Sequence, residues 1–169
     1  IRIKAMEQAD AVAIQTDNIQ GRVDFDEQKG FFKANEAFLT TELPYNEYIT
    51  SMNEFIWDMS GQNVRFRADT AQLGQFRSTH PDQDSLRFEG KTAFYDLFNY
   101  QLSIGEVPNI ISADAFIFPD SGRVEIEPVT GKGRHQRDNG DAKDAEPQID
   151  PEQRRQHLVA PGMIAAAVE

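Results

Sequence analysis

Residues 55–69, FIWDMSGQNVRFRAD, decide the fold class. The second half alternates apolar Val64 and Phe66 with two arginines, which is the period-two pattern of a half-buried β-strand. The first half also alternates, and Trp57 lies on its apolar face. Residues 60–63, SGQN, separate the halves and have the composition of a hairpin turn. We therefore predict two antiparallel strands joined by a tight turn.

The same alternation recurs along the chain. It is found in residues 85–96 (SLRFEGKTAFYD), 100–107 (YQLSIGEV) and 113–127 (ADAFIFPDSGRVEIE). In the last of these, residues 119–122 (PDSG) have the composition of a tight reversal between two strands. The prediction is an all-β fold of antiparallel strands, arranged as a sandwich, a jelly roll or an open β-groove, with a flexible C-terminal tail.

Two segments admit a helical alternative. Residues 45–57, YNEYITSMNEFIW, also fit a 3.6-residue period, but their aromatic and β-branched content favours strands. Residues 26–39, DEQKGFFKANEAFL, have room for a helical turn or two, which Gly30 would interrupt.

A short motif, G-[RK]-[VT]-x-[FI], occurs three times, beginning at Gly21, Gly90 and Gly122. An Ala-Asp pair precedes each copy, at residues 9, 68 and 113. The unequal spacing excludes a solenoid of fixed period. We interpret the pairing as a recurring unit in which Ala-Asp opens one strand and Gly-basic-β-branched opens the next. A chance match between short β patterns is the alternative, and a repeated ligand site is a third reading.

The chain divides by composition into two parts. Residues 1–130 carry the alternating segments and predict one β-rich domain with internal strand-turn-strand repeats. Residues 131–169 begin with a long polar run that has too few apolar side chains to offset the entropy of ordering. We predict a polar tail there, with a short helix beginning at Asp150 and Pro151.

The bulk chemistry excludes several classes of function. The net charge is −11 and the sequence pI about 4.7, which argues against nucleic acid and against electrostatic docking on anionic lipid. There is no cysteine, so disulfides and thiolate metal sites are excluded. No nucleotide-binding or hydrolase fingerprint occurs, and no apolar run is long enough to cross a bilayer. We expect no cofactor and no transmembrane segment.

One long stretch resembles a known group of proteins. Residues 21–59 match a pattern of very long Bacteroidetes proteins, Glu-φ-Pro-x-Asn-x-Tyr-Ile-x-x-Met-(Asn/Asp)-x-Phe-x-Trp-x-Met. The matching residues here are Glu42, Leu43, Pro44, Asn46, Tyr48, Ile49, Met52, Asn53, Phe55, Trp57 and Met59. Residues 107–127 also resemble a segment of these proteins. The Ala-Asp and Gly-x-Val pairing is faintly similar to the strand units of lipopolysaccharide-transport jelly rolls. The resemblance implies a β-rich cell-envelope or surface protein of repeated units.

Candidate ligand residues are few. Tyr45, Tyr48, Trp57, Tyr95 and Tyr100 would suit a sugar- or lipid-facing surface if they were exposed. Asp82 and Asp84 offer oxygen ligands for calcium, although their loop lacks the glycine and distal glutamate of an EF-hand. Further carboxylate pairs occur at Asp24 and Asp26 and at Glu125 and Glu127. Such pairs serve glycoside hydrolysis when they meet in a cleft.

Three functions therefore stay open. The first is a non-enzymatic structural or binding module of a bacterial envelope protein, whose partners are other protein segments or repeats of the same protein. The second is a carrier whose β-groove binds an acyl chain or a glycan. The third is a glycoside-acting enzyme, which requires two carboxyl groups that meet in a pocket.

Overall fold

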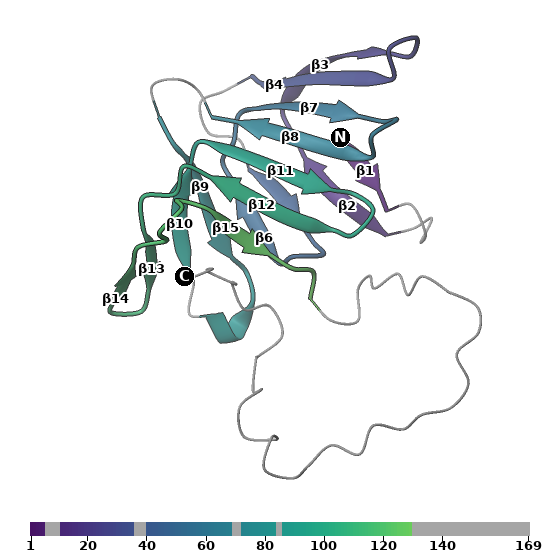
Figure 1. The fold of residues 1–169 in the computed structure, drawn as a ribbon. Helices are drawn as coiled ribbons and strands as arrows, with labels where there is room; N and C mark the ends of the chain where they lie inside the picture. Colours follow the sequence, from purple (N-terminus) through teal and green to yellow (C-terminus); the bar gives the residue numbers. More distant parts are fainter. Residues whose placement is uncertain (6–10, 36–39, 69–71, 84–85, 130–169) are drawn as a thin grey trace, which may run out of the picture.

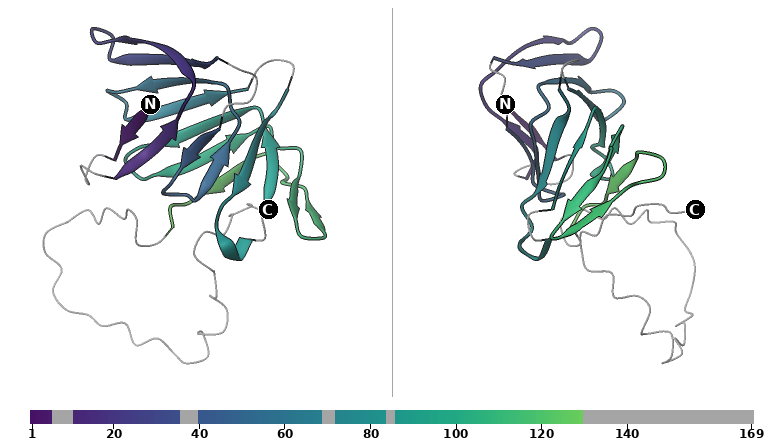
Figure 2. Two further views of the ribbon diagram at one scale, coloured as in Figure 1. Left: turned by 180° about the vertical axis from the view of Figure 1, so that it is seen from behind. Right: turned by 90° about the vertical axis from the view of Figure 1, so that its left-hand side faces the viewer.

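The computed structural model describes residues 1–5, 11–35, 40–68, 72–83 and 86–129. They form two antiparallel β-sheets packed face to face (Figures 1 and 2), so the prediction of an all-β sandwich is confirmed. Within these ranges no α-helix occurs, and the one helical element is the 3₁₀ turn η1 (Pro81–Gln83). The predicted tail and its short helix at residue 150 lie outside the described residues.

The eight-stranded sheet has the order β1-β2-β5-β6-β9-β10-β13-β14. Its strands are β1 (Arg2–Lys4), β2 (Val12–Thr16), β5 (Thr41–Leu43), β6 (Tyr48–Thr50), β9 (Gly74–Ser78), β10 (Arg87–Gly90), β13 (Ile110–Ser112) and β14 (Ala115–Ile117). The seven-stranded sheet has the order β15-β12-β11-β8-β7-β4-β3. Its strands are β3 (Ile19–Asp24), β4 (Lys29–Ala34), β7 (Glu54–Asp58), β8 (Asn63–Arg67), β11 (Thr92–Asp96), β12 (Gln101–Gly105) and β15 (Val124–Ile126).

The chain builds both sheets by alternating between them. From β3 onward it makes a hairpin in one sheet, crosses over, and makes the next hairpin in the other. The crossings are short, and Lys91 alone separates β10 from β11. A Cβ on Gly90 would lie 2.4 Å from Cγ2 of Ile104, so the close approach at this crossing requires glycine. The result is a sandwich that grows along one axis as the sequence advances.

The three hairpin turns of the seven-stranded sheet share one construction. The strand before each turn ends in aspartate, at Asp24, Asp58 and Asp96, and a carboxylate oxygen accepts backbone N–H groups from the turn. The last turn residue has a positive φ: 53° at Gln28, 52° at Gln62 and 55° at Tyr100. The carboxylate therefore satisfies turn amides that no strand can pair.

The prediction that residues 119–122 form the turn between two paired strands is wrong. β14 and β15 belong to different sheets, so PDSG carries the chain across the sandwich rather than around a hairpin tip. Gly122 has a φ of 62° and its N–H donates to the carbonyl oxygen of Pro119 at 2.9 Å. The hairpin that does form here joins β13 to β14 through Ala113 and Asp114.

The predicted two-strand unit differs from the structure in the same way. The three glycine motifs all lie at or beside a crossing from the eight-stranded to the seven-stranded sheet, at β2 to β3, β10 to β11 and β14 to β15, and Gly90 is the last residue of β10 before its crossing. Thr92 and Val124 open their strands as expected, whereas Gly21 lies inside β3 opposite Phe32. Ala-Asp does not open a strand where it is described: Ala68 follows β8, and Ala113 lies in a turn. The pair at residues 9 and 10 lies outside the described residues.

Both segments with a helical alternative form strands. Residues 45–57 contain β6 and β7, which lie in different sheets. Residues 29–34 form β4 instead of a helical turn, because the ring of Phe32 covers the bare backbone of two glycines. A Cβ on Gly21 or Gly30 would lie 2.3 or 2.5 Å from that ring.

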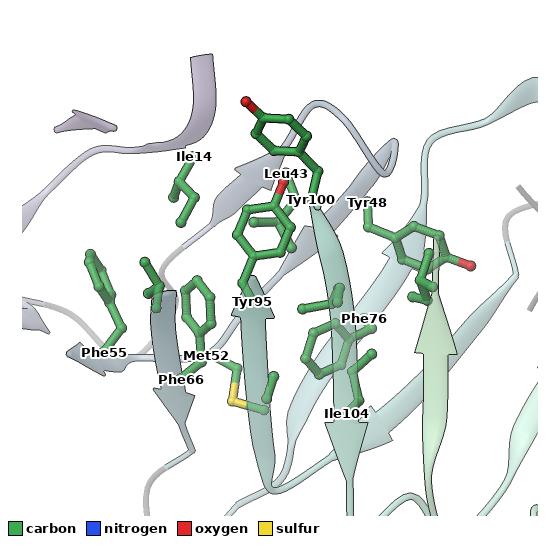
Figure 3. Packing of buried hydrophobic residues seen from close by; sticks show 14 of the residues in the cluster. Ile14, Leu43, Tyr48, Met52, Phe55, Phe66, Phe76, Tyr95, Tyr100 and Ile104 are labelled. Carbon is green, nitrogen blue, oxygen red and sulfur yellow. The ribbon is translucent and has the colours of Figure 1, made fainter. Parts of the chain in front are cut away.

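The core fills the space between the sheets. Phe55 stacks on Phe32 with ring centroids 4.8 Å apart and lies 5.4 Å from Phe66, while Phe76 stacks on Phe88 at 5.3 Å. Figure 3 shows Phe55, Phe66 and Phe76 among the aliphatic side chains of the core, which include Ile14, Leu43, Met52 and Ile104. The inward faces of both sheets are thus used for packing.

Candidate functional site

The predicted aromatic surface is part of the core. All four tyrosines are buried, and Trp57 is half-buried on the inward face of its sheet. Tyr45 and Tyr100 stack on each other with ring centroids 4.0 Å apart. The expectation of an exposed platform is therefore corrected: Tyr48, Trp57 and Tyr95 lie in strands and face the core, and Tyr45 and Tyr100 lie in turns but are also buried.

Burial also determines the chemistry of these phenols. Desolvation raises the pKa of Tyr48 and of Tyr95 well above the ordinary value. The Tyr48 hydroxyl is within hydrogen-bond distance of Oε1 of Gln83, at 3.2 Å, whereas the Tyr95 hydroxyl is buried with no partner among the described residues. Both phenols stay protonated at neutral pH and act as packing groups.

The Pro-x-Asn-x-Tyr part of the resemblance forms a corner between the sheets. Nδ2 of Asn46, in the β5–β6 turn, donates to the carbonyl oxygens of Tyr100 at 2.9 Å and Ile126 at 3.2 Å. The N–H of Val129 donates to the carbonyl oxygen of Tyr45 at 2.8 Å. Asn46 is buried, and its two bonds join a turn of one sheet to the β11–β12 turn and to β15 of the other. This motif is structural in the fold.

The carboxylate candidates do not converge. Asp82 is exposed in η1, where its N–H donates to Nδ1 of His80, and Asp84 lies outside the described residues. Within the described residues no group of three or more His, Cys, Asp or Glu side chains is placed to hold a metal ion. Two cavities are described, and each has a single carboxylate in its lining, Glu54 in one and Glu89 in the other.

The ends of the two sheets are open among the described residues. At the N-terminal end β1 and β3 each pair with one strand, and at the C-terminal end β14 and β15 do the same. The N–H of Asn35 donates to the carbonyl oxygen of Asn18 at 3.1 Å. In an antiparallel pair, successive residues of a strand direct their backbone N–H and C=O groups alternately to one neighbour and to the other side. Since Asn18 bonds to the β4 side, the backbone groups of Ile19, Gly21 and Val23 point to the free edge of β3.

The C-terminal edge strand is apolar and exposed. The exposed fraction is 64% for Phe116, 42% for Ile117 and 69% for the following Phe118. β14 pairs only with β13, and this hairpin lies at the opposite end of the molecule from β3 and β4 (Figure 1). A strand that pairs on one side only and exposes large apolar side chains in succession is of the kind that can pair with another chain.

A groove of about 980 Å³ crosses the outer face of the seven-stranded sheet. One cross-strand row supplies apolar contacts: Phe31 lies opposite Ile56, and Arg65 lies between Ile56 and Phe94. Ile56 and Phe94 are exposed on this face. The next row runs through Lys33, Glu54 and Arg67, and Nζ of Lys33 bonds to Oε1 of Glu54 at 2.8 Å.

The groove is basic on an acidic protein. Its lining has four cationic side chains against one carboxylate, Glu54. The cations are Lys33, Arg65, Arg67 and Arg123. Within the described part of the chain, Arg65 and Arg67 form no ion pair. Since the whole chain has a net charge of −11, this face is locally opposite in sign to the rest.

Comparison with known proteins adds no relative: no protein-family model and no curated protein matches the chain. The described residues contain no helix that is long and apolar enough to cross a membrane.

The groove and the open edges were not identified from the sequence as sites. The groove is lined by residues of six strands, β3, β4, β7, β8, β11 and β12, and no single segment of the sequence encodes how these strands pair. The edge at β14 has a local signal, because AFIF in residues 115–118 breaks the alternation of polar and apolar residues. A strand that is apolar at consecutive positions is either buried on both faces or covered by a partner.

Proposed function

We propose that this protein is a non-enzymatic structural module that joins neighbouring β-units through the open edges of its two sheets. The observation that carries the proposal is the edge strand β14, whose apolar side chains are exposed and whose outer backbone groups pair with no strand in the described residues. Free edges of this kind form β-augmentation contacts, in which main-chain hydrogen bonds extend the sheet.

The path of the chain supports the same proposal. Each hairpin adds two strands to one sheet before the chain crosses, so a further unit would extend both sheets without rearranging those already present. β14 of one unit would meet β1 of the next, and β15 would meet β3. The partners are then units of the same build, and a bacterial cell-envelope location is the part of the proposal that the resemblance alone suggests.

Hydrogen exchange of the purified protein over a concentration series tests this proposal. The amides of Gly21 and Val23 point to the free edge of β3, whereas those of Gln20 and Arg22 pair with β4 and serve as the internal control. We expect protection of the edge amides to rise with concentration while the control amides stay protected throughout.

Two substitutions sharpen the result. Phe116→Lys places a charge on β14 and should abolish the protection of β3 at the other end of the molecule, because the two ends meet head to tail. Leu73→Lys makes the same chemical change at an exposed residue outside the edge strands and should leave protection intact. Edge amides that exchange freely at millimolar concentration would overturn the proposal.

A further inference from the structure

The β3–β4 turn carries an exposed aromatic side chain among carboxylates. This acidic tip consists of Asp24, Phe25, Asp26 and Glu27. Phe25 is 79% exposed, more than any other large apolar side chain in the described residues. Oδ1 of Asp24 accepts the N–H groups of Asp26 at 3.1 Å and Glu27 at 3.0 Å. The turn is thus held in shape while two further carboxylates and the ring face solvent.

A matched position shows that this exposure is particular to the tip. Leu97 follows Asp96 in the β11–β12 turn, as Phe25 follows Asp24, and both turns have the same aspartate contacts. Leu97 is 4% exposed and belongs to the core. The conformation of the turn therefore does not by itself expose its first residue. Phe25 is exposed because it lies at the end of the sheet, where no described residue covers it.

The groove on the seven-stranded sheet complements the tip in both chemistry and charge. Ile56 and Phe94 offer apolar contact for a ring, and Arg65 and Arg67 form no ion pair in the described residues, whereas Arg123 pairs with Glu125 at 2.8 Å. The groove lining has four cations and one carboxylate, and Glu125 beside it pairs with Arg123, which leaves a local charge of +2 (4 − 1 − 1), whereas the tip has −3 from its three carboxylates. Opposite charges of this density steer two surfaces together and fix their register.

The tip cannot reach the groove of its own molecule. β3 and β4 belong to the sheet whose outer face forms the groove, and paired strands direct the turn away along the strand axis. The complementary surface must therefore come from another molecule.

We propose that the acidic tip of one copy of this chain docks in the basic groove of a second copy. Phe25 packs on Ile56 and Phe94, and the carboxylates of Asp26 and Glu27 pair with the guanidinium groups of Arg65 and Arg67. This contact uses side chains on the face of a sheet and is independent of strand pairing at the sheet edges.

Complementary charge reversal tests the contact. The double variant Arg65→Glu with Arg67→Glu reverses the charge of the groove and keeps the acidic tip. The double variant Asp26→Lys with Glu27→Lys reverses the charge of the tip and keeps the basic groove. We expect self-association measured by sedimentation velocity to weaken at least tenfold for each variant alone. An equimolar mixture of the two should form a heterodimer, because one intact tip then meets one intact groove.

The controls separate this contact from folding and from edge pairing. Arg77→Glu with Arg87→Glu reverses two arginines on the outer face of the other sheet and should leave self-association unchanged. Phe116→Lys removes the pairing at the sheet edges, so the self-association that this variant keeps should come from the tip and the groove and should weaken when Phe25→Ser is added. The proposal is overturned if the wild-type protein is monomeric at millimolar concentration, or if the mixture fails to form a heterodimer although both variants show wild-type circular dichroism.

Discussion

Replacing the buried amide of Asn46 by a carboxyl group tests whether the corner between the sheets is held by its two hydrogen bonds. Nδ2 donates to the carbonyl oxygens of Tyr100 and Ile126, and both lie in the other sheet or at its turn. Asn46→Asp keeps the shape of the side chain but replaces the donor by an acceptor. The substitution therefore removes the bonds without opening a cavity.

The expected cost follows from the two acceptors that lose their donor. A buried acceptor left unsatisfied costs about 1–3 kcal/mol, so two cost about 2–6 kcal/mol at neutral pH. That is a large part of the total stability of a domain, which is about 5–15 kcal/mol. The new carboxyl group faces carbonyl oxygens in a buried site, so its pKa in the folded state is raised above its unfolded value of about 3.9.

The sign of this pKa shift adds a pH signature. Well below pH 4 the carboxyl group is neutral in both the folded and the unfolded state, and its protonated oxygen can donate to a carbonyl. As the pH rises above that value the penalty grows, and it levels off above the folded pKa. The free energy of unfolding, measured by urea titration of the variant and the wild type at pH 4 and pH 7, should therefore differ more at pH 7.

The matched control is Asn35→Asp. The amide of Asn35 donates to Oδ1 of Asn18 at 3.1 Å, but this contact is exposed. The same chemical change there should alter the free energy of unfolding by no more than about 0.5 kcal/mol. If Asn46→Asp lies within about 1 kcal/mol of the wild type at pH 7, the corner does not depend on these bonds and the reasoning fails.

Three further substitutions and titrations test other parts of the fold. Gly21→Ala should destabilise the protein by about 1–3 kcal/mol in urea unfolding, because its Cβ would lie 2.3 Å from the ring of Phe32; an unchanged midpoint would show that the ring moves freely. Tyr95→Phe should raise the free energy of unfolding by up to about 1 kcal/mol, since its buried hydroxyl has no partner among the described residues; a loss of stability would reveal a bound water. Asp58 should titrate below its ordinary pKa by NMR, because its carboxylate accepts the N–H of Gly61 and the hydroxyl of Ser60. The contribution of the Asp58 carboxylate to stability is then present above about pH 4 and is lost as the pH falls through the lowered pKa. Asp58→Asn should therefore make the free energy of unfolding fall less steeply at acidic pH. An ordinary pKa for Asp58 would contradict these hydrogen bonds in the turn.

The strands were predictable from the sequence, whereas their partners were only partly so. Alternation in residues 63–67 identifies β8 because a strand facing a core on one side has a period of two. Alternation does not say whether the next strand folds back in the same sheet or crosses to the other, because both place the same side chains inside. For this reason residues 113–127 were assigned to one hairpin although they span a crossing.

The turns do contain a signal that separates the two cases. In each hairpin of the seven-stranded sheet the first strand ends at an aspartate, Asp24, Asp58 or Asp96, and the second strand begins five residues later. Crossings lack that aspartate: Lys91 is one such link, and residues 51–53 are another. An aspartate spaced in this way predicts a return, because its carboxylate satisfies the turn amides that a crossing would leave to other partners.

The groove and the exposure of the tip could not be predicted from the sequence, because each depends on which strands and side chains lie next to it in the fold. The first turn residue is buried in the core at Leu97 and exposed at Phe25, although both follow an aspartate with the same contacts to its turn. β14 is exposed for a related reason, since no described strand lies beyond it. The exposed apolar side chains at the two ends of the sandwich therefore have one physical cause: among the described residues, neither sheet has a further strand to cover them. A neighbour at an end, as we propose, would bury apolar area at about 25 cal/mol per Å² without changing any contact inside the sandwich.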